Sequence, residues 1–152
     1  MMIRAASQKD SGSISELIST LVLKYIAPSC SDSGAQVLLN SMDANSIKSY
    51  IEQGYQYHVG EVNNEIIGVV AVKENSHLYH LFIDDLHQGK GFAKQLWEHA
   101  KSLCIKQGNN GTFTVNSALN AVQVYKKWGF IPYMNVRERG GVKDLPMRLK
   151  MT

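Results

Sequence analysis

A glycine-bearing junction between a predicted strand and a predicted helix constrains this chain more than any other stretch. The apolar run Leu81–Ile83 leads into a polar turn, and Gly89 and Gly91 follow where a helical pattern begins. Glycine removes side-chain bulk where a backbone approaches a ligand closely or takes a positive φ. The first N–H groups of the next helix are unpaired and lie at its positive dipole end, which favours an anion. The stretch Leu81–Ala93 is therefore expected to hold an anion, with a phosphate as the best fit.

Length and charge narrow the class of protein. A chain of 152 residues fits one domain, so residues 1–152 are expected to form a single domain. A net charge of +3 is too small for the basic face of a nucleic-acid-binding protein. The N-terminus lacks the apolar segment of a signal peptide, and no apolar run reaches transmembrane length. We expect a soluble cytoplasmic protein with neither a nucleic-acid nor a membrane partner.

Metal and disulfide sites are not expected. Cys30 and Cys104 are too few for a disulfide framework, and Cys104 falls on the apolar stripe of a helix as a buried free thiol. Asp84, Asp85 and His87 resemble a set of metal ligands, but an acidic turn of this kind is normally only solvated.

Hydrophobic periodicity predicts helices in the first third of the chain. A short strand over 2–6 precedes a helix over 13–25, which begins with a capping box at Ser13–Glu16. A second helical region covers 35–53 and is broken near Asn40 and Ser41, with Asp43 as a cap and Gly54 as the stop.

Strands dominate the rest of the chain. Asn63 and Asn64 favour a two-residue type I′ turn, and a complete helix between the fourth and fifth strands makes that pair parallel. Ser117 is expected to cap a short helix that ends at Gly129, and Gly140-Gly141 to turn the last hairpin, with Pro132 and Pro146 at strand starts or edges. The remaining predicted elements are strands over 55–62, 65–72, 77–83, 112–115, 131–137 and 145–151, and a helix over 91–107.

The expected fold class is α+β. Its centre is a mixed, mostly antiparallel sheet of about six to seven strands with about four flanking helices. Simple alternation along the fourth strand places His77, Tyr79, Leu81 and Ile83 on one face, and Leu78, His80 and Phe82 on the other.

At this point the sequence resembles the GNAT family of acyl-CoA-dependent N-acyltransferases. The pyrophosphate loop of that family reads Gln/Arg-x-x-Gly-x-Gly/Ala, and Gln88–Ala93 matches it position for position. A second family signature is present as Asn120, Ala121, Tyr125 and Gly129-Phe130, in the expected order and with slightly different spacing. The two signatures span about 80–130, and the order of elements extends the resemblance over nearly the whole chain.

The resemblance implies acetyl-CoA as co-substrate, without a metal. In this family the fourth and fifth strands splay apart, and the pantetheine arm enters the gap like an extra strand. The resemblance assigns the arm's amides to backbone groups of Leu81, Phe82 and Ile83. It also assigns contact with CoA to Asn120 and Tyr125. The resemblance further implies that the pyrophosphate binds to the loop and the start of the helix, at Gln88, Gly89, Lys90, Gly91, Phe92 and Ala93.

The resemblance also implies a mechanism in which an amine attacks the thioester directly in a ternary complex. Tyr125 corresponds to the tyrosine that protonates the departing CoA thiolate. A residue at the position of His77 or Tyr79 would act as the base through water, while His80 and Glu61 are weaker candidates. A backbone N–H of the fourth strand, that of Ile83, would stabilise the oxyanion.

Several alternatives remain open at the level of sequence. The enzyme would acetylate a primary amine of a small molecule, an amino acid or a protein, whereas a catalytically silent acyl-CoA-binding module would keep the same loop. An unrelated nucleotide-binding domain is disfavoured because the lysine-serine/threonine of a P-loop is missing. Segments 25–55 and 137–143 are expected to bind the acceptor, and a homodimer through the late strands is compatible with the family. Four acidic residues could attract a cationic amine, although it is simpler to interpret them as scattered surface charges: Asp32, Asp43, Glu52 and Glu61.

Overall fold

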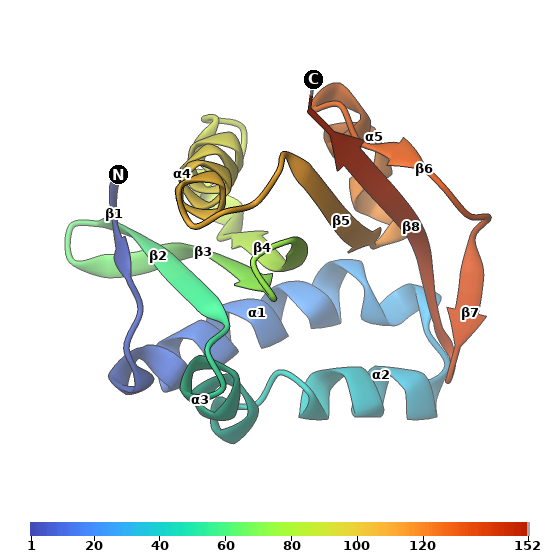
Figure 1. Cartoon of the computed structure of the whole chain (residues 1–152). Helices are drawn as coiled ribbons and strands as arrows, with labels where there is room; N and C mark the ends of the chain where they lie inside the picture. Colours follow the sequence, from blue (N-terminus) through green and yellow to red (C-terminus); the bar gives the residue numbers. More distant parts are fainter. Residues whose placement is uncertain (152) are drawn as a thin grey trace.

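A computed structural model describes residues 1–151 of the chain as a mixed sheet covered by helices on both faces (Figure 1). The strand order is β1-β2-β3-β4-β5-β8-β6, with β7 pairing along the other part of β8. Every pair is antiparallel except β4 with β5, which confirms the predicted fold class. The strands in the described part are β1 Met2–Ala5, β2 Gln56–Val62, β3 Glu65–Lys73, β4 His77–Ile83, β5 Thr112–Ser117, β6 Ile131–Pro132, β7 Arg137–Arg139 and β8 Val142–Lys150.

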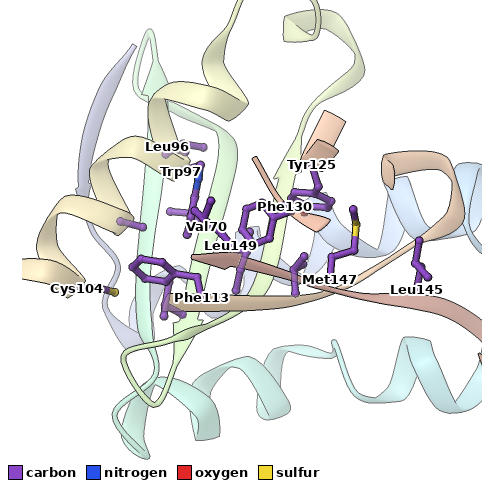
Figure 2. Close-up of a cluster of buried hydrophobic side chains, with 14 of the residues drawn as sticks. Val70, Leu96, Trp97, Cys104, Phe113, Tyr125, Phe130, Leu145, Met147 and Leu149 are labelled. Atoms are coloured by element: carbon purple, nitrogen blue, oxygen red, sulfur yellow. The ribbon is translucent and has the colours of Figure 1, made fainter. Parts of the chain in front are cut away.

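Two hydrophobic clusters fill the spaces between the sheet and its helices. In Figure 1, α4 and α5 lie on one side of the sheet, and α1, α2 and α3 lie on the other. On the first side Trp97 packs edge-on against Phe113, with ring centroids 5.1 Å apart, and Phe130 lies beside them (Figure 2). Cys104 is a buried free thiol in this cluster, as predicted. The helices in the described part are α1 Ser11–Tyr25, α2 Asp32–Asn40, α3 Ala44–Glu52, α4 Phe92–Lys106 and α5 Val122–Lys127.

Within residues 1–151 no helix combines the length and the apolar composition needed to cross a membrane.

The first two helices begin earlier than their sequence patterns predict. The predicted capping box at Ser13–Glu16 is wrong, because α1 starts at Ser11 after a short 3-10 turn. The Ser7 N–H instead donates to the Asp10 carboxylate at 2.8 Å. Likewise α2 begins at Asp32 rather than at residue 35, since the Ser31 hydroxyl accepts from the Gly34 N–H at 3.0 Å. The break before α3 and the Asp43 cap are confirmed.

The C-terminal strands are divided differently from the prediction. The segment 131–137 forms two short strands, β6 and β7, rather than one. The Gly140-Gly141 turn is confirmed, but β8 already begins at Val142, so Pro146 lies inside the strand opposite Asn116. Ser117 is the last residue of β5 rather than a helix cap, and a 3-10 turn over Leu119–Ala121 leads into α5.

A β-bulge in β4 overturns the predicted division of that strand into two faces. Ala71 of β3 pairs with His80 and Val72 pairs with Leu78, so Tyr79 is an extra residue without a partner. A bulge shifts the alternation of side chains by one residue. The first face therefore carries Leu78 with Leu81 and Ile83, toward α4, whereas Tyr79 joins His80 and Phe82 on the side of α1.

The bulge leaves His80 fully buried against Tyr57 of β2. The Tyr57 hydroxyl and His80 Nδ1 lie 2.9 Å apart, and the rings of Tyr50, Tyr79 and Phe82 surround the imidazole. Burial lowers the pKa of His80 to about 3, because an imidazolium would lose its hydration there. The native state therefore holds a neutral imidazole at this position.

This burial predicts a measurable loss of stability in acid. In the unfolded chain His80 has a pKa of about 6.5, so it takes up a proton as pH falls below that value, whereas His80 in the folded protein stays neutral. The contribution of His80 to stability is therefore complete above pH 6.5 and is lost as pH falls. The substitution His80→Gln retains a polar partner for Tyr57. Between pH 4 and 6.5 it should reduce the slope of the unfolding free energy against pH by the amount that corresponds to the uptake of up to about one proton on unfolding. Urea unfolding across this range measures the slope. Equal slopes in the two proteins would contradict the assignment.

Candidate active site

The two parallel strands at the centre of the sheet separate after a short region of pairing. β4 meets β5 only at His77 with Thr114 and at Leu78 with Val115. The rest of β4 lies beside a cavity of about 580 Å³. This cavity reaches from the gap between the strands to α1, α2 and the β7–β8 hairpin.

The unpaired edge of β4 offers backbone groups to the gap. The Asp84 N–H donates to the Ile67 carbonyl of β3 at 2.8 Å. Because hydrogen bonding alternates along an antiparallel pair, the groups of Phe82 also point to β3, whereas those of Leu81 and Ile83 point to the gap. Three residues are predicted to bind a ligand through their backbone. The backbone groups of Leu81 and Ile83 face the gap and could do so, whereas those of Phe82 face β3.

The glycine loop lies at the far end of β4. Gly89 and Gly91 have φ values of 78° and 79°, which only glycine adopts readily, and α4 begins immediately afterwards. A Cβ at either position would meet no atom within 4 Å, so the backbone conformation rather than space requires glycine here. The side chain of Gln88 donates to the Ile83 carbonyl at 2.9 Å and so fastens the loop to β4.

The loop and the helix start together form an anion-binding arrangement. The first amides of α4, at Phe92, Ala93 and Lys94, have no partner within the helix. Lys90 and Lys94 are exposed beside them and add positive charge. Of the predicted pyrophosphate residues, Gln88 lines the cavity beside β4, and those from Gly89 to Ala93 follow it in the loop and the first turn of α4.

Tyr125 reaches the same cavity from α5. It is 8% exposed, and its ring packs against Trp128 and Phe130 with centroids 5.7 and 5.5 Å apart. Burial raises the pKa of Tyr125, so its phenol is protonated at neutral pH. Asn120 lies in the preceding 3-10 turn and also lines the cavity.

The candidate bases differ in protonation state. His77 is half-buried beside the cavity, and its Nδ1 lies 2.7 Å from the Thr114 hydroxyl of β5. Burial lowers the pKa of His77, so it is neutral and able to accept a proton at neutral pH. Burial raises the pKa of Tyr79, which keeps that phenol protonated and makes it the poorer base.

Two weaker candidates lack a suitable environment. His80 lines the cavity but has a strongly lowered pKa and is bonded to Tyr57. Glu61 does not line the cavity, and its carboxylate is ion-paired with Arg4 of β1.

The carboxylates of the acidic turn before the loop form hydrogen bonds and an ion pair within the protein. Asp84 accepts from the Leu86 N–H at 2.9 Å, and Asp85 contacts Lys24 and Tyr25 at the end of α1. Among residues 1–151 no group of three His, Cys, Asp or Glu side chains is arranged to hold a metal ion.

The outer wall of the cavity comes from the two segments expected to bind the acceptor. α1 and α2 contribute Tyr25, Val37 and Leu38, and the hairpin contributes Arg139 and Lys143. None of the acids considered for a cationic amine, Asp32, Asp43, Glu52 or Glu61, lines the cavity.

Comparison with solved structures finds the same arrangement of strands and helices in acetyltransferases. A GCN5-related N-acetyltransferase of Rhodopseudomonas palustris is 14% identical, with a TM-score of 0.82 over 99% of this chain and 95% of that one. The PaiA N-acetyltransferase of Thermoplasma acidophilum, solved in complex with coenzyme A, is 18% identical, with a TM-score of 0.77 over 99% and 98%. YncA of Salmonella typhimurium, solved with acetyl-CoA, is 18% identical, with a TM-score of 0.66 over 99% and 93%. At these identities the likeness concerns the fold.

The family of this chain is shown by a match of its sequence to a family pattern, rather than by similarity to one protein. No curated protein matches this chain. The pattern of the acetyltransferase (GNAT) domain, however, matches residues 26–151, which include the open edge of β4, the glycine loop and Tyr125. The chain therefore belongs to the GNAT acetyltransferase family.

Proposed function

We propose that this protein transfers the acetyl group of acetyl-CoA to a primary amine, with both substrates bound at once. The observation that supports this proposal most is the unpaired edge of β4. It faces a cavity with an anion-binding loop at one end and a protonated tyrosine at its side. An acyl-CoA needs all three, because it carries amides, a pyrophosphate and a thiolate leaving group.

The cofactor would lie along β4. Leu81 and Ile83 offer backbone groups to the pantetheine amides in the manner of an added strand. The Ile83 carbonyl is already bonded to Gln88, so the Ile83 N–H remains for the ligand or for the oxyanion. The pyrophosphate would lie against the amides of Gly89 to Ala93, with Asn120 near the thiol end.

The chemical step then needs three proton transfers. The acceptor ammonium loses a proton, through water, to His77, and the free amine forms a C–N bond with the acetyl carbon. The C–S bond breaks as the oxyanion collapses, and Tyr125 gives its proton to the CoA sulfur. The attacking nitrogen then gives up its second proton to the Tyr125 phenolate, so that the product is a neutral amide and Tyr125 is again a phenol. A thiol has a pKa of about 8.5 and an ordinary phenol one of about 10, so this transfer requires the electrostatics of the closed site.

Substitution of Gly91 tests the cofactor site. Gly91→Val forces a β-branched residue into a left-handed conformation at the start of α4 and should abolish acetyl-CoA binding in calorimetry. Gly108→Val is the matched control, because Gly108 has a φ of 101° and equally open surroundings at the other end of α4. It should lower stability while leaving the affinity unchanged. Absence of acetyl-CoA binding by the unaltered protein would refute the proposal.

Removal of one hydroxyl tests the general acid and separates an enzyme from a silent binding module. Tyr125→Phe should lower kcat for CoA release by roughly 10²-fold or more, since general acid catalysis contributes on that scale, and leave acetyl-CoA affinity intact. Tyr133→Phe, an exposed tyrosine outside the cavity, should keep full activity. Thiol release is measured over a panel of amines. Full activity of Tyr125→Phe would exclude its role, and binding without turnover of any amine would favour the silent module.

A further inference from the structure

The outer wall of the cavity is closed by a contact between two backbones. The Ser31 N–H at the start of α2 donates to the Gly141 carbonyl at 3.0 Å. One turn later, Gly34 is buried directly against the β7–β8 turn. A Cβ at Gly34 would lie 2.7 Å from the Gly140 oxygen and 2.7 Å from Gly141 carbon and oxygen atoms. Figure 1 shows the start of α2 beside this turn.

This contact joins segments that are distant in the sequence into one wall across the cavity from β4. Val37 and Leu38 of α2 line it on one side of the junction, and Gly140 and Val142 of the hairpin line it on the other. An amine presented on a protein surface would require an open groove at this place. The volume of about 580 Å³ must also take the acyl-pantetheine end, which leaves space for a small molecule.

The inner surface of the wall is apolar, and its charges do not suit a polycation. The charged residues that line the cavity in the described part are Arg139, Lys143 and Asp144. Asp144 accepts from Arg137 at 2.7 Å and lies 3.6 Å from Arg139, so its charge is neutralised. No lining carboxylate is left to hold a second ammonium group. The apolar residues that line the cavity from the region of α1 and α2 include Leu21, Ile26, Val37, Leu38 and Met42, and Phe82 of β4 lies on the same side of the sheet.

From these observations we infer that the acceptor is a small, free monoamine with an apolar body, and that Gly34 imposes this limit by allowing α2 to close on the hairpin. The inference rests on the proposed acetyltransferase function and specifies its acceptor. The contact holds α2 against the hairpin on the outer side of the cavity, while β4 and Tyr125 on the opposite side remain unaffected.

A pair of helical glycines provides the test of the closing contact. Neither Gly34 nor Gly12 has a positive φ, and both lie in the first turn of a helix, but a Cβ at Gly12 would meet nothing within 4 Å. Gly34→Ala should raise KM for 2-phenylethylamine at least tenfold and increase acetylation of a lysine-containing peptide relative to it. The calorimetric affinity for acetyl-CoA should stay within twofold. Gly12→Ala should match the unaltered protein in all three measurements. An unchanged KM in folded Gly34→Ala would overturn the role of Gly34.

The unaltered protein tests the acceptor class without any substitution. With acetyl-CoA bound, kcat/KM for 2-phenylethylamine should exceed that for spermidine and for the lysine-containing peptide at least tenfold. A preference for spermidine or for the peptide would overturn the inference and leave the acetyltransferase proposal standing. Failure to bind acetyl-CoA would instead remove the proposed function itself, so the two failures are distinguishable.

Discussion

The separation of β4 from β5 is the constraint on which the rest of the structure depends. A sheet normally satisfies the backbone groups of its central strands, yet here the pairing stops after Leu78 and Val115. The groups of Leu81 and Ile83 are left facing a cavity in the middle of the molecule. Such an edge is stable only where it is solvated or bound by a ligand, and here the surrounding helices and hairpin form the other walls of the cavity.

The two faces of the sheet serve this opening in different ways. On the side of α4, the packing of Trp97, Phe113 and Phe130 fixes the position from which Tyr125 enters the cavity. On the side of α1, the bulge at Tyr79 turns two successive aromatic side chains the same way. One face thus supplies the phenol that we propose protonates the departing thiol, and the other supplies the aromatic and apolar wall that the proposed acceptor would meet.

Several features determined by neighbouring residues could be predicted from the sequence, whereas features that depend on the register between strands could not. The junction from β4 through the glycine loop to α4 is local, as is the Asn63-Asn64 turn, and both have the predicted conformation. The bulge at Tyr79 has no sequence signal, because it exists only in the register with β3. The ion pair between Glu61 and Arg4 could not be predicted for a similar reason, because Arg4 lies on a strand that is distant in the sequence. The roles of Tyr125 and Asn120 came from the family resemblance, and the structure adds only that both lie at the cavity.

The glycines of the loop and the glycine of α2 are required for opposite reasons, and this determines which replacements each position would tolerate over evolution. At Gly89 and Gly91 there is room for a side chain, and the obstacle is the handedness of the backbone. Asparagine and aspartate adopt left-handed conformations more easily than other L-residues, so asparagine is the least costly neutral substitute there. At Gly34 the backbone would accept any L-residue, but a single methyl group has no space. Drift at the loop would thus be limited by chirality, and drift at α2 by volume.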